Sequence, residues 1–210
     1  MGCTIARKRD EARRLELATA AVEVLRQQGL QNTSMRSLAE SIGVKRSTFY
    51  WYFGDISEIL LYFMDHVRAQ EAAWVVERIQ GLDHPLDVLG AFVRAEHGFF
   101  RDNRLEDFVI LLCQYWALGG EELRLEYRRQ MRQQVGPVRD LMVGMIEAGI
   151  ADGRVRPCNA NALVEMVLAT LDGAMVHGVL RGVDTGPTDD FLDKHLLAPL
   201  RMPVGGREND

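Results

Sequence analysis

The sequence predicts an all-α fold in which a small three-helix N-terminal domain precedes a larger helical domain. Apolar residues recur at helical spacing through most of the 210 residues, and no segment alternates as a strand does. Glycine and proline separate the helical segments. The length suits one small module and one larger domain. We expect the first domain over residues 1–54, the second over 55–202 and a disordered tail over 203–210.

The individual helices follow from the apolar stripes and their end signals. The first helix ends at Gly29, after a stripe made of Leu17, Ala20, Ala21, Val24 and Leu25. Two short helices follow over 35–42 and 45–52, and a long one, capped by Asp55 or Ser57, runs over 55–79. Later helices are expected over 86–100, 105–118, 121–151 with a bend at Gly136-Pro137, 160–180 and 188–200.

The segment from Thr33 to Phe53 predicts two short helices that meet at a glycine turn. Thr33 or Ser34 can cap the first of them, whose apolar stripe consists of Met35, Leu38, Ala39 and Ile42. Gly43 can adopt the positive φ angle that a sharp turn needs, and Val44 fills the angle between the helices. This is the pattern of a helix-turn-helix DNA-binding motif.

The second short helix buries Phe49 and Phe53 and leaves a polar face less constrained. That face carries Lys45, Arg46, Ser47, Thr48, Tyr50 and Trp51. Cations suit base edges, and hydroxyl groups suit phosphate oxygens. The same spacing also fits an ordinary helical hairpin with a polar outer face, so spacing alone leaves both interpretations open.

The charge distribution favours the DNA-binding interpretation. The first fifty residues hold nine Lys and Arg against five Asp and Glu, whereas the whole chain has a net charge of −5. A basic N-terminal domain on an acidic body indicates that the N-terminal domain meets a polyanion.

Other features indicate a cytoplasmic protein with free thiols. The segment from Met1 to Asp10 turns charged before any apolar run, and we expect no secretory signal and no membrane span of roughly 20 apolar residues. Gly2 does not indicate myristoylation, because Ala6 stands where Ser or Thr is needed. The cysteines, Cys3, Cys113 and Cys158, are odd in number and far apart, which favours reduced thiols over a disulfide frame or a zinc site.

Residues 17–60 resemble the N-terminal domain of the TetR family of bacterial transcriptional regulators. The resemblance is carried by Ala20-Ala21, Gly29, Leu38-Ala39, Gly43-Val44, Ser47-Thr48-Phe49-Tyr50, Phe53, Glu58 and Leu60. It implies that Thr33, Thr48 and Tyr50 contact phosphates, that Lys45, Arg46 and Ser47 face base edges, and that Trp51 and Tyr52 lie beside the DNA backbone. The chain departs from the family pattern at Ile56, where a lysine is common, and at Tyr52, where a histidine is frequent.

The resemblance also implies a helical body that dimerises and binds a small-molecule effector. Aromatic and thioether side chains suit an adaptable apolar pocket, although at helical spacing each is more often plain core. The candidate effector residues are Phe92, Glu96, Phe108, Tyr115, Trp116, Met142, Met145, Met166 and His177. For the dimer interface on the last two long helices, the candidates are Leu168, Leu171, Met175, Phe191, Leu192 and Leu196.

These observations predict a ligand-responsive regulator, most simply a repressor, that binds a pseudo-palindromic operator as a homodimer. No cofactor, metal or membrane partner is expected. The five histidines lack His-Glu-x-x-His spacing, and neither a glycine-rich phosphate loop nor a nucleophile elbow is present, so an enzyme is not expected. An all-helical carrier of lipophilic ligands without DNA binding is the alternative.

Overall fold

The computed structural model describes the backbone of residues 2–203 and the side chains of residues 10–121 and 124–203. Its helices are α1 (Gly2–Gln28), η1 (Leu30–Asn32), α2 (Met35–Ser41), α3 (Arg46–Tyr52), α4 (Ile56–Ile79), α5 (Pro85–Asp102), α6 (Glu106–Leu118), α7 (Glu121–Ala151), α8 (Ala160–Arg181), α9 (Gly186–Phe191), η2 (Leu192–Leu197) and η3 (Ala198–Leu200). Within these residues the one β-type pairing is an isolated bridge between Val155 and Arg201. The all-α prediction is confirmed. The expected disordered tail, apart from Pro203, lies outside the described residues.

The helices pack into two compact units. The head unit comprises the residues up to Ala72 together with Asp107–Leu118, and the body unit comprises Ala73–Glu106 together with the residues from Gly119 onward. The head unit therefore contains α1, α2, α3, most of α4 and nearly all of α6. This packing does not divide at residue 54, because α4 continues without a break and α6 packs with the head. The functional boundary at 54/55 remains a prediction.

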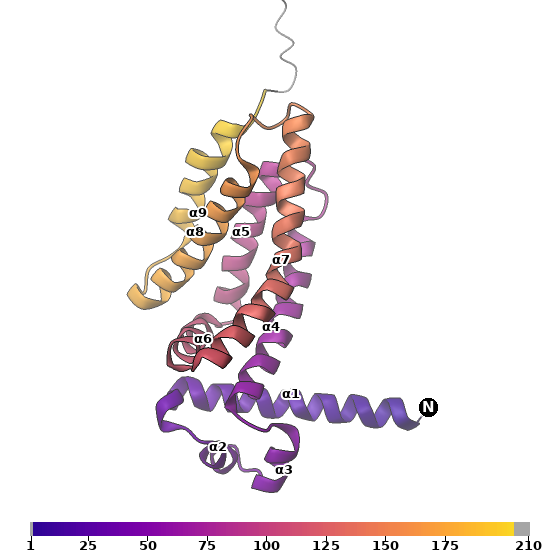
Figure 1. Ribbon diagram of the computed structural model, residues 1–210, viewed down its shortest axis with the longest axis vertical. Helices are drawn as coiled ribbons and strands as arrows, with labels where there is room; N and C mark the ends of the chain where they lie inside the picture. The colour runs from indigo at the N-terminus through magenta and orange to yellow at the C-terminus, as the bar shows by residue number, and fades with distance from the viewer. Residues whose placement is uncertain (1, 204–210) are drawn as a thin grey trace, which may run out of the picture. The chain divides into compact units, whose positions relative to one another are not determined.

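The head core is built from the apolar faces of short and long helices. On α1 the buried apolar residues are Leu17, Ala18, Ala21, Val22 and Leu25. The expected stripe was wrong at Ala20 and Val24, which are half-buried because the inward face is turned toward Ala18 and Val22. α2, α3 and α4 add Leu38, Ala39, Phe49, Ile59 and Leu60, and Phe53, which follows α3, joins them; each has no exposed surface. Figure 1 shows α2 and α3 on the same side of α1.

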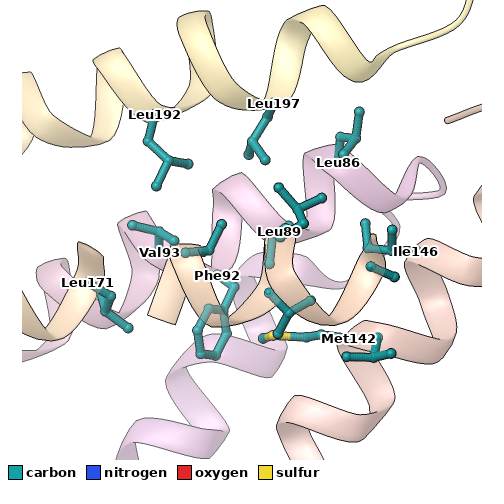
Figure 2. Close-up of a cluster of buried hydrophobic side chains, with 14 of the residues drawn as sticks. Leu86, Leu89, Phe92, Val93, Met142, Ile146, Leu171, Leu192 and Leu197 are labelled. Atoms are coloured by element: carbon teal, nitrogen blue, oxygen red, sulfur yellow. The ribbon is translucent and has the colours of Figure 1, made fainter. Parts of the chain in front are cut away.

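The body unit is a bundle in which α5, α7, α8 and α9 run alongside one another (Figure 1). Its core is one continuous apolar cluster, and α5 contributes Leu86, Leu89, Phe92 and Val93 to it. Figure 2 shows Leu192 and Leu197 pointing from the C-terminal segment toward α5. Met142 and Ile146 enter the cluster from α7, and Leu171 enters it from α8.

The C-terminal segment departs from the single helix expected over 188–200. It begins as α9, widens into the π-helix η2 and ends in the 3₁₀ turn η3. Pro199 lacks the N–H that a regular α-helix would use there. The segment is tied down by Arg156 N–H donating to Leu200 O at 2.8 Å and by an ion pair between Arg94 of α5 and Asp193.

Candidate nucleic-acid interface

The turn between α2 and α3 is fixed by local hydrogen bonds. Ser34 caps α2 by accepting from the Ser37 N–H at 3.1 Å, while Ser37 Oγ accepts from the Ser34 N–H at 2.8 Å, which makes a reciprocal capping box. Gly43 has φ +72°, and the Val44 N–H then donates to Ala39 O at 3.0 Å. The predicted role of Gly43 is therefore confirmed, and Ser34 rather than Thr33 is the cap.

α3 presents a polar face above a single buried anchor. Phe49 is fully buried, whereas its neighbours in the predicted set, Lys45, Arg46, Ser47, Thr48, Tyr50 and Trp51, are exposed. Trp51 is 68% exposed, and its ring meets the edge of Tyr52 at a centroid distance of 4.7 Å. All six residues are therefore accessible to a partner around the buried Phe49.

Two of the predicted DNA-binding residues, Thr33 and Tyr52, are half-buried and not exposed. Thr33 Oγ1 donates to Gly29 O at 2.7 Å. Tyr52 has a raised pKa because of burial, a hydrogen bond to Asp10 on α1 and the Asp10 charge, which Arg13 partly opposes. The Asp10 carboxylate of α1 therefore favours the protonated hydroxyl of Tyr52 within the head.

Arg14 of α1 contacts side chains on both sides of the junction between α3 and α4. Its guanidinium lies 4.4 Å from the ring centroid of Tyr62 and 5.3 Å from that of Phe53, and it pairs with Glu58 at 2.7 Å. Glu58 in turn accepts from the Gly54 N–H at 2.8 Å. Arg14 was not predicted as part of this junction, because nothing in the α1 pattern indicates a partner on α4.

Tyr62 is held as a neutral donor beside the same arginine. Its hydroxyl donates to Glu11 at 2.7 Å. Burial, this hydrogen bond and the charge of Glu11 raise the pKa of Tyr62 to about 12, against the opposing charge of Arg14. α1 is thus joined to α4 by polar contacts beside the apolar core.

One carboxylate of α2 lies between two arginines at the edge of the α3 face. Glu40 Oε1 accepts from Arg36 Nε at 3.0 Å and from Arg46 Nη2 at 3.2 Å. All three side chains are exposed. No sequence pattern indicated a role for Glu40.

The structure does not bring the nine predicted effector residues together in one unit. Phe92, Glu96 and Met142 are buried in the body unit, and Met145 is half-buried there. Phe108 and Tyr115 are buried on α6, which belongs to the head unit, whereas Trp116, Met166 and His177 are exposed. Sequence spacing could not show that α6 packs with the head. The effector site therefore remains a prediction.

The body unit contains a buried polar junction that sequence reasoning missed. His97 of α5 is hydrogen-bonded through Nδ1 to Asp189 of α9 at 2.8 Å and through Nε2 to Leu171 O of α8 at 3.2 Å. Burial alone would lower the pKa of His97, but the hydrogen bond and charge of Asp189 raise it, with Arg101 opposing. Because both neighbours are acceptors, the doubly protonated ring satisfies both contacts.

The head unit also contains a buried acid. Glu71 of α4 is 2% exposed, and its Oε2 accepts from Arg68 at 2.6 Å. An acidic residue in a helical pattern is ordinarily placed on the outer face, so no sequence signal indicated this burial.

The predicted dimer-interface residues divide between core and surface. Leu171 and Leu192 were wrongly placed at the interface, since both belong to the buried core of their own chain. Leu168, Met175 and Leu196 are half-buried, and Phe191 is 65% exposed with its ring 4.4 Å from that of His195. The exposed stripe on α8 instead consists of Ala162, Met166, Ala169, Gly173, His177 and Leu180.

α8 is long and apolar enough to cross a membrane by length and composition alone. This differs from the expectation that no segment would reach that limit. Only 22% of its most apolar stretch is buried inside the chain. Among the side chains that the structure describes, no group of three or more His, Cys, Asp or Glu could hold a metal ion.

Comparison with known proteins agrees with this geometry. Residues 17–63 match the sequence model of the bacterial regulatory proteins of the tetR family. This part of the head is therefore similar in sequence to the N-terminal domain of the TetR family. The chain is also 30% identical over 79 residues to the HTH-type transcriptional regulator HbdR of Aromatoleum sp. (strain CIB). That alignment covers 38% of this chain and 34% of the relative, so the TetR-type similarity spans about a third of the length of HbdR.

Solved structures extend the fold similarity to nearly the whole chain. The FadR regulator of Bacillus subtilis, in complex with stearoyl-CoA, superposes with a TM-score of 0.71 at 18% identity, over 87% of this chain and 96% of FadR. AibR, in complex with isovaleryl coenzyme A and operator DNA, gives a TM-score of 0.63 at 16% identity, over 91% of this chain and 99% of AibR. At these identities the similarity shows that the chain shares the fold of such TetR-type regulators.

Proposed function

We propose that this protein is a transcriptional repressor that binds a pseudo-palindromic operator as a homodimer and leaves it when a small amphipathic effector binds. The observation that carries the proposal is the exposed face of α3, where two cations, two hydroxyl groups and two aromatic side chains stand above buried Phe49. Such side chains suit the phosphates and base edges of a major groove. The TetR-type head supports the same conclusion.

The exposed stripe of α8 supports the homodimer. One short reader helix contacts too few base edges for useful specificity, and a two-fold pair of heads adds a second half-site. Ala162, Ala169 and Gly173 leave room for a second copy of the helix, and the apolar area of Met166 and Leu180 is covered by it. A membrane is the poorer partner, because Glu165 and Asp172 interrupt the apolar stretch.

For the effector we propose a coenzyme A thioester. The support is that two proteins of this fold, FadR of Bacillus subtilis and AibR, were solved with stearoyl-CoA and isovaleryl coenzyme A. An acyl chain is apolar, as are Phe92, Met142 and Met145 among the predicted effector residues. The effector reduces DNA affinity only by the difference in its own affinity for the two states of the protein.

The connection from effector to DNA is proposed to pass through α4 and α6. α4 continues from the head unit into the body unit between Ala72 and Ala73. α6 packs within the head, where Phe108 meets Phe63 at a centroid distance of 4.9 Å and Asp107 pairs with Arg26 of α1 at 3.1 Å. A shift of either helix would therefore change the packing contacts within the head.

Selection from a randomised duplex pool tests the proposal. The full chain is expected to enrich one pseudo-palindromic sequence and to bind it far more tightly than a scrambled duplex at moderate salt. Stearoyl-CoA or isovaleryl-CoA should weaken that binding, whereas coenzyme A alone should not. If the protein binds a thioester but no DNA, it is a ligand carrier and not a regulator. If it binds the operator with an affinity that no thioester changes, coenzyme A thioesters are excluded as effectors.

A further inference from the structure

Among the side chains that the structure describes, the guanidinium of Arg46 donates to one acceptor, the carboxylate of Glu40. Arg46 occupies the first turn of α3, and its Nη2 donates to Glu40 Oε1 at 3.2 Å. The same oxygen accepts from Arg36 Nε at 3.0 Å, one turn earlier on α2. A cation on the groove-facing surface is thus engaged by an acid before DNA arrives.

From this contact we infer that Glu40 is a specificity-determining residue that restrains Arg46 on non-cognate DNA. The inference rests on the proposed DNA-binding function. A phosphate oxygen offers the guanidinium nearly the same contact that Glu40 already provides, so exchanging one for the other gains little. A guanine edge offers O6 and N7 to a bidentate pair, which a single carboxylate oxygen does not match.

The geometry of the Arg46–Glu40 pair is that of a weak contact, which DNA can replace. One hydrogen bond joins the pair, both side chains are exposed to water (46% for Arg46 and 60% for Glu40), and the accepting oxygen is shared. Exposed pairs of this kind contribute little to folding stability. Arg36 stands at i,i−4 to Glu40 and keeps the carboxylate on the α3 side of α2.

The negative charge acts in the same direction as the contact. Glu40 lies next to the surface that meets phosphates, so it opposes the sequence-independent attraction that dominates non-specific binding. A cognate base contact replaces the lost ion pair, whereas scrambled DNA does not. Glu40 therefore lowers affinity for scrambled DNA more than affinity for the operator.

Glu40→Gln tests the inference with the duplex selected from the random pool and its scrambled form. The variant is expected to bind the scrambled duplex about fivefold to tenfold more tightly and the selected duplex less than about twofold more tightly. Its thermal unfolding should match that of the wild type. Glu16→Gln is the matched control, because it removes the same charge from a carboxylate that pairs with Arg13 on α1.

Repeating the measurement in the Arg46→Gln variant separates the restraint of Arg46 from the general electrostatic effect of the Glu40 charge. In Arg46→Gln, the added Glu40→Gln change should affect both duplexes equally, since no guanidinium remains to be restrained. An equal gain on both duplexes in the wild-type background would overturn the inference, as would an unequal gain that persists in Arg46→Gln. Failure of the wild type to select any sequence would instead overturn the proposed function.

Discussion

α3 and α8 each bury one face and leave the other open, but their open faces differ in chemistry. The open face of α3 carries cations, hydroxyl groups and aromatic rings, whereas the exposed stripe of α8 carries Ala, Gly, Met, Leu and His177, with exposed Glu165 and Asp172 beside it. Water solvates the first face well, but the second leaves apolar area hydrated at a cost in free energy. The difference indicates a polyanion as the partner of α3 and another apolar helix as the partner of α8.

The largest expected effect comes from placing charges on the α8 face. Met166→Glu together with Leu180→Glu should give a folded monomer, because both side chains are exposed in the single chain (58% and 70%) and carboxylates oppose an apolar interface. Operator affinity should fall by about a hundredfold or more, since two linked heads no longer bind together. Sedimentation and operator titration measure the two effects.

Leu141→Glu is the matched control for that experiment. Leu141 is 73% exposed on α7, outside the α8 stripe, so the variant should remain dimeric. A dimer that survives the α8 changes but not Leu141→Glu would place the interface on α7. Leu171→Glu is unsuitable, because it puts a charge inside the core of its own chain.

A second prediction concerns how the body holds α9 against α5 and α8. Asp189→Ala should lower the free energy of unfolding by about 3 kcal/mol, because it leaves His97 buried without its charged partner. Asp190→Ala is the control, since this neighbour is exposed and its loss should change stability by about 0.5 kcal/mol or less. Chemical denaturation near pH 6 measures both values. Equal losses in the two variants would show that the His97–Asp189 contact does not stabilise the body unit.

The same junction predicts a pH dependence with a definite sign. The folded pKa of His97 is raised, so its contribution is complete below the ordinary histidine pKa of about 6.5 and is lost as pH rises through the higher folded value. The wild type should therefore lose stability over this range relative to Asp189→Ala. A difference between the two proteins that does not shrink as pH rises would contradict the assignment.

The head could be predicted from sequence because its signals are local. Ser34, Gly43 and Phe49 each act within a few residues of their own position, through a cap, a positive φ angle and a buried anchor. The roles of Gly43 and Phe49 followed from spacing alone, whereas spacing limited the cap to Thr33 or Ser34 without choosing between them. The contacts that Arg14 makes with α4 did not follow, because its partners are more than forty residues away.

The body could be predicted only as a set of helices. Leu171 lies among apolar residues in α8, a helix that is apolar on nearly every side, so periodicity did not show which side faces the core. The packing of α6 with the head and the burial of His97 and Glu71 depend on helices distant in sequence. Tertiary packing determines which face of each helix is buried and which helices are neighbours, and the periodicity of a single sequence does not show this.

A third prediction sharpens the α3 side of the comparison. Arg46→Ala should reduce discrimination between the selected and scrambled duplexes by about 1–3 kcal/mol, because it removes a base contact. Tyr50→Phe should weaken binding to both duplexes alike, because the hydroxyl serves a phosphate. Competition titrations at fixed salt measure both effects. Equal losses on the two duplexes for Arg46→Ala would exclude it from the base-reading residues.

The smallest expected effect compares two glycines on α7. A Cβ at Gly149 would lie 2.8 Å from Val155 Cγ2 and 2.9 Å from Pro85 Cγ, and the rigid proline ring cannot turn away. Gly149→Ala should therefore destabilise the protein by about 1–2 kcal/mol. A Cβ at Gly144 meets nothing within 4 Å, so Gly144→Ala should stabilise the helix by about 0.5–1 kcal/mol. Thermal unfolding of the two variants should thus move in opposite directions, and a shift of the same sign would show that α5 and α7 do not approach as closely as the structure places them.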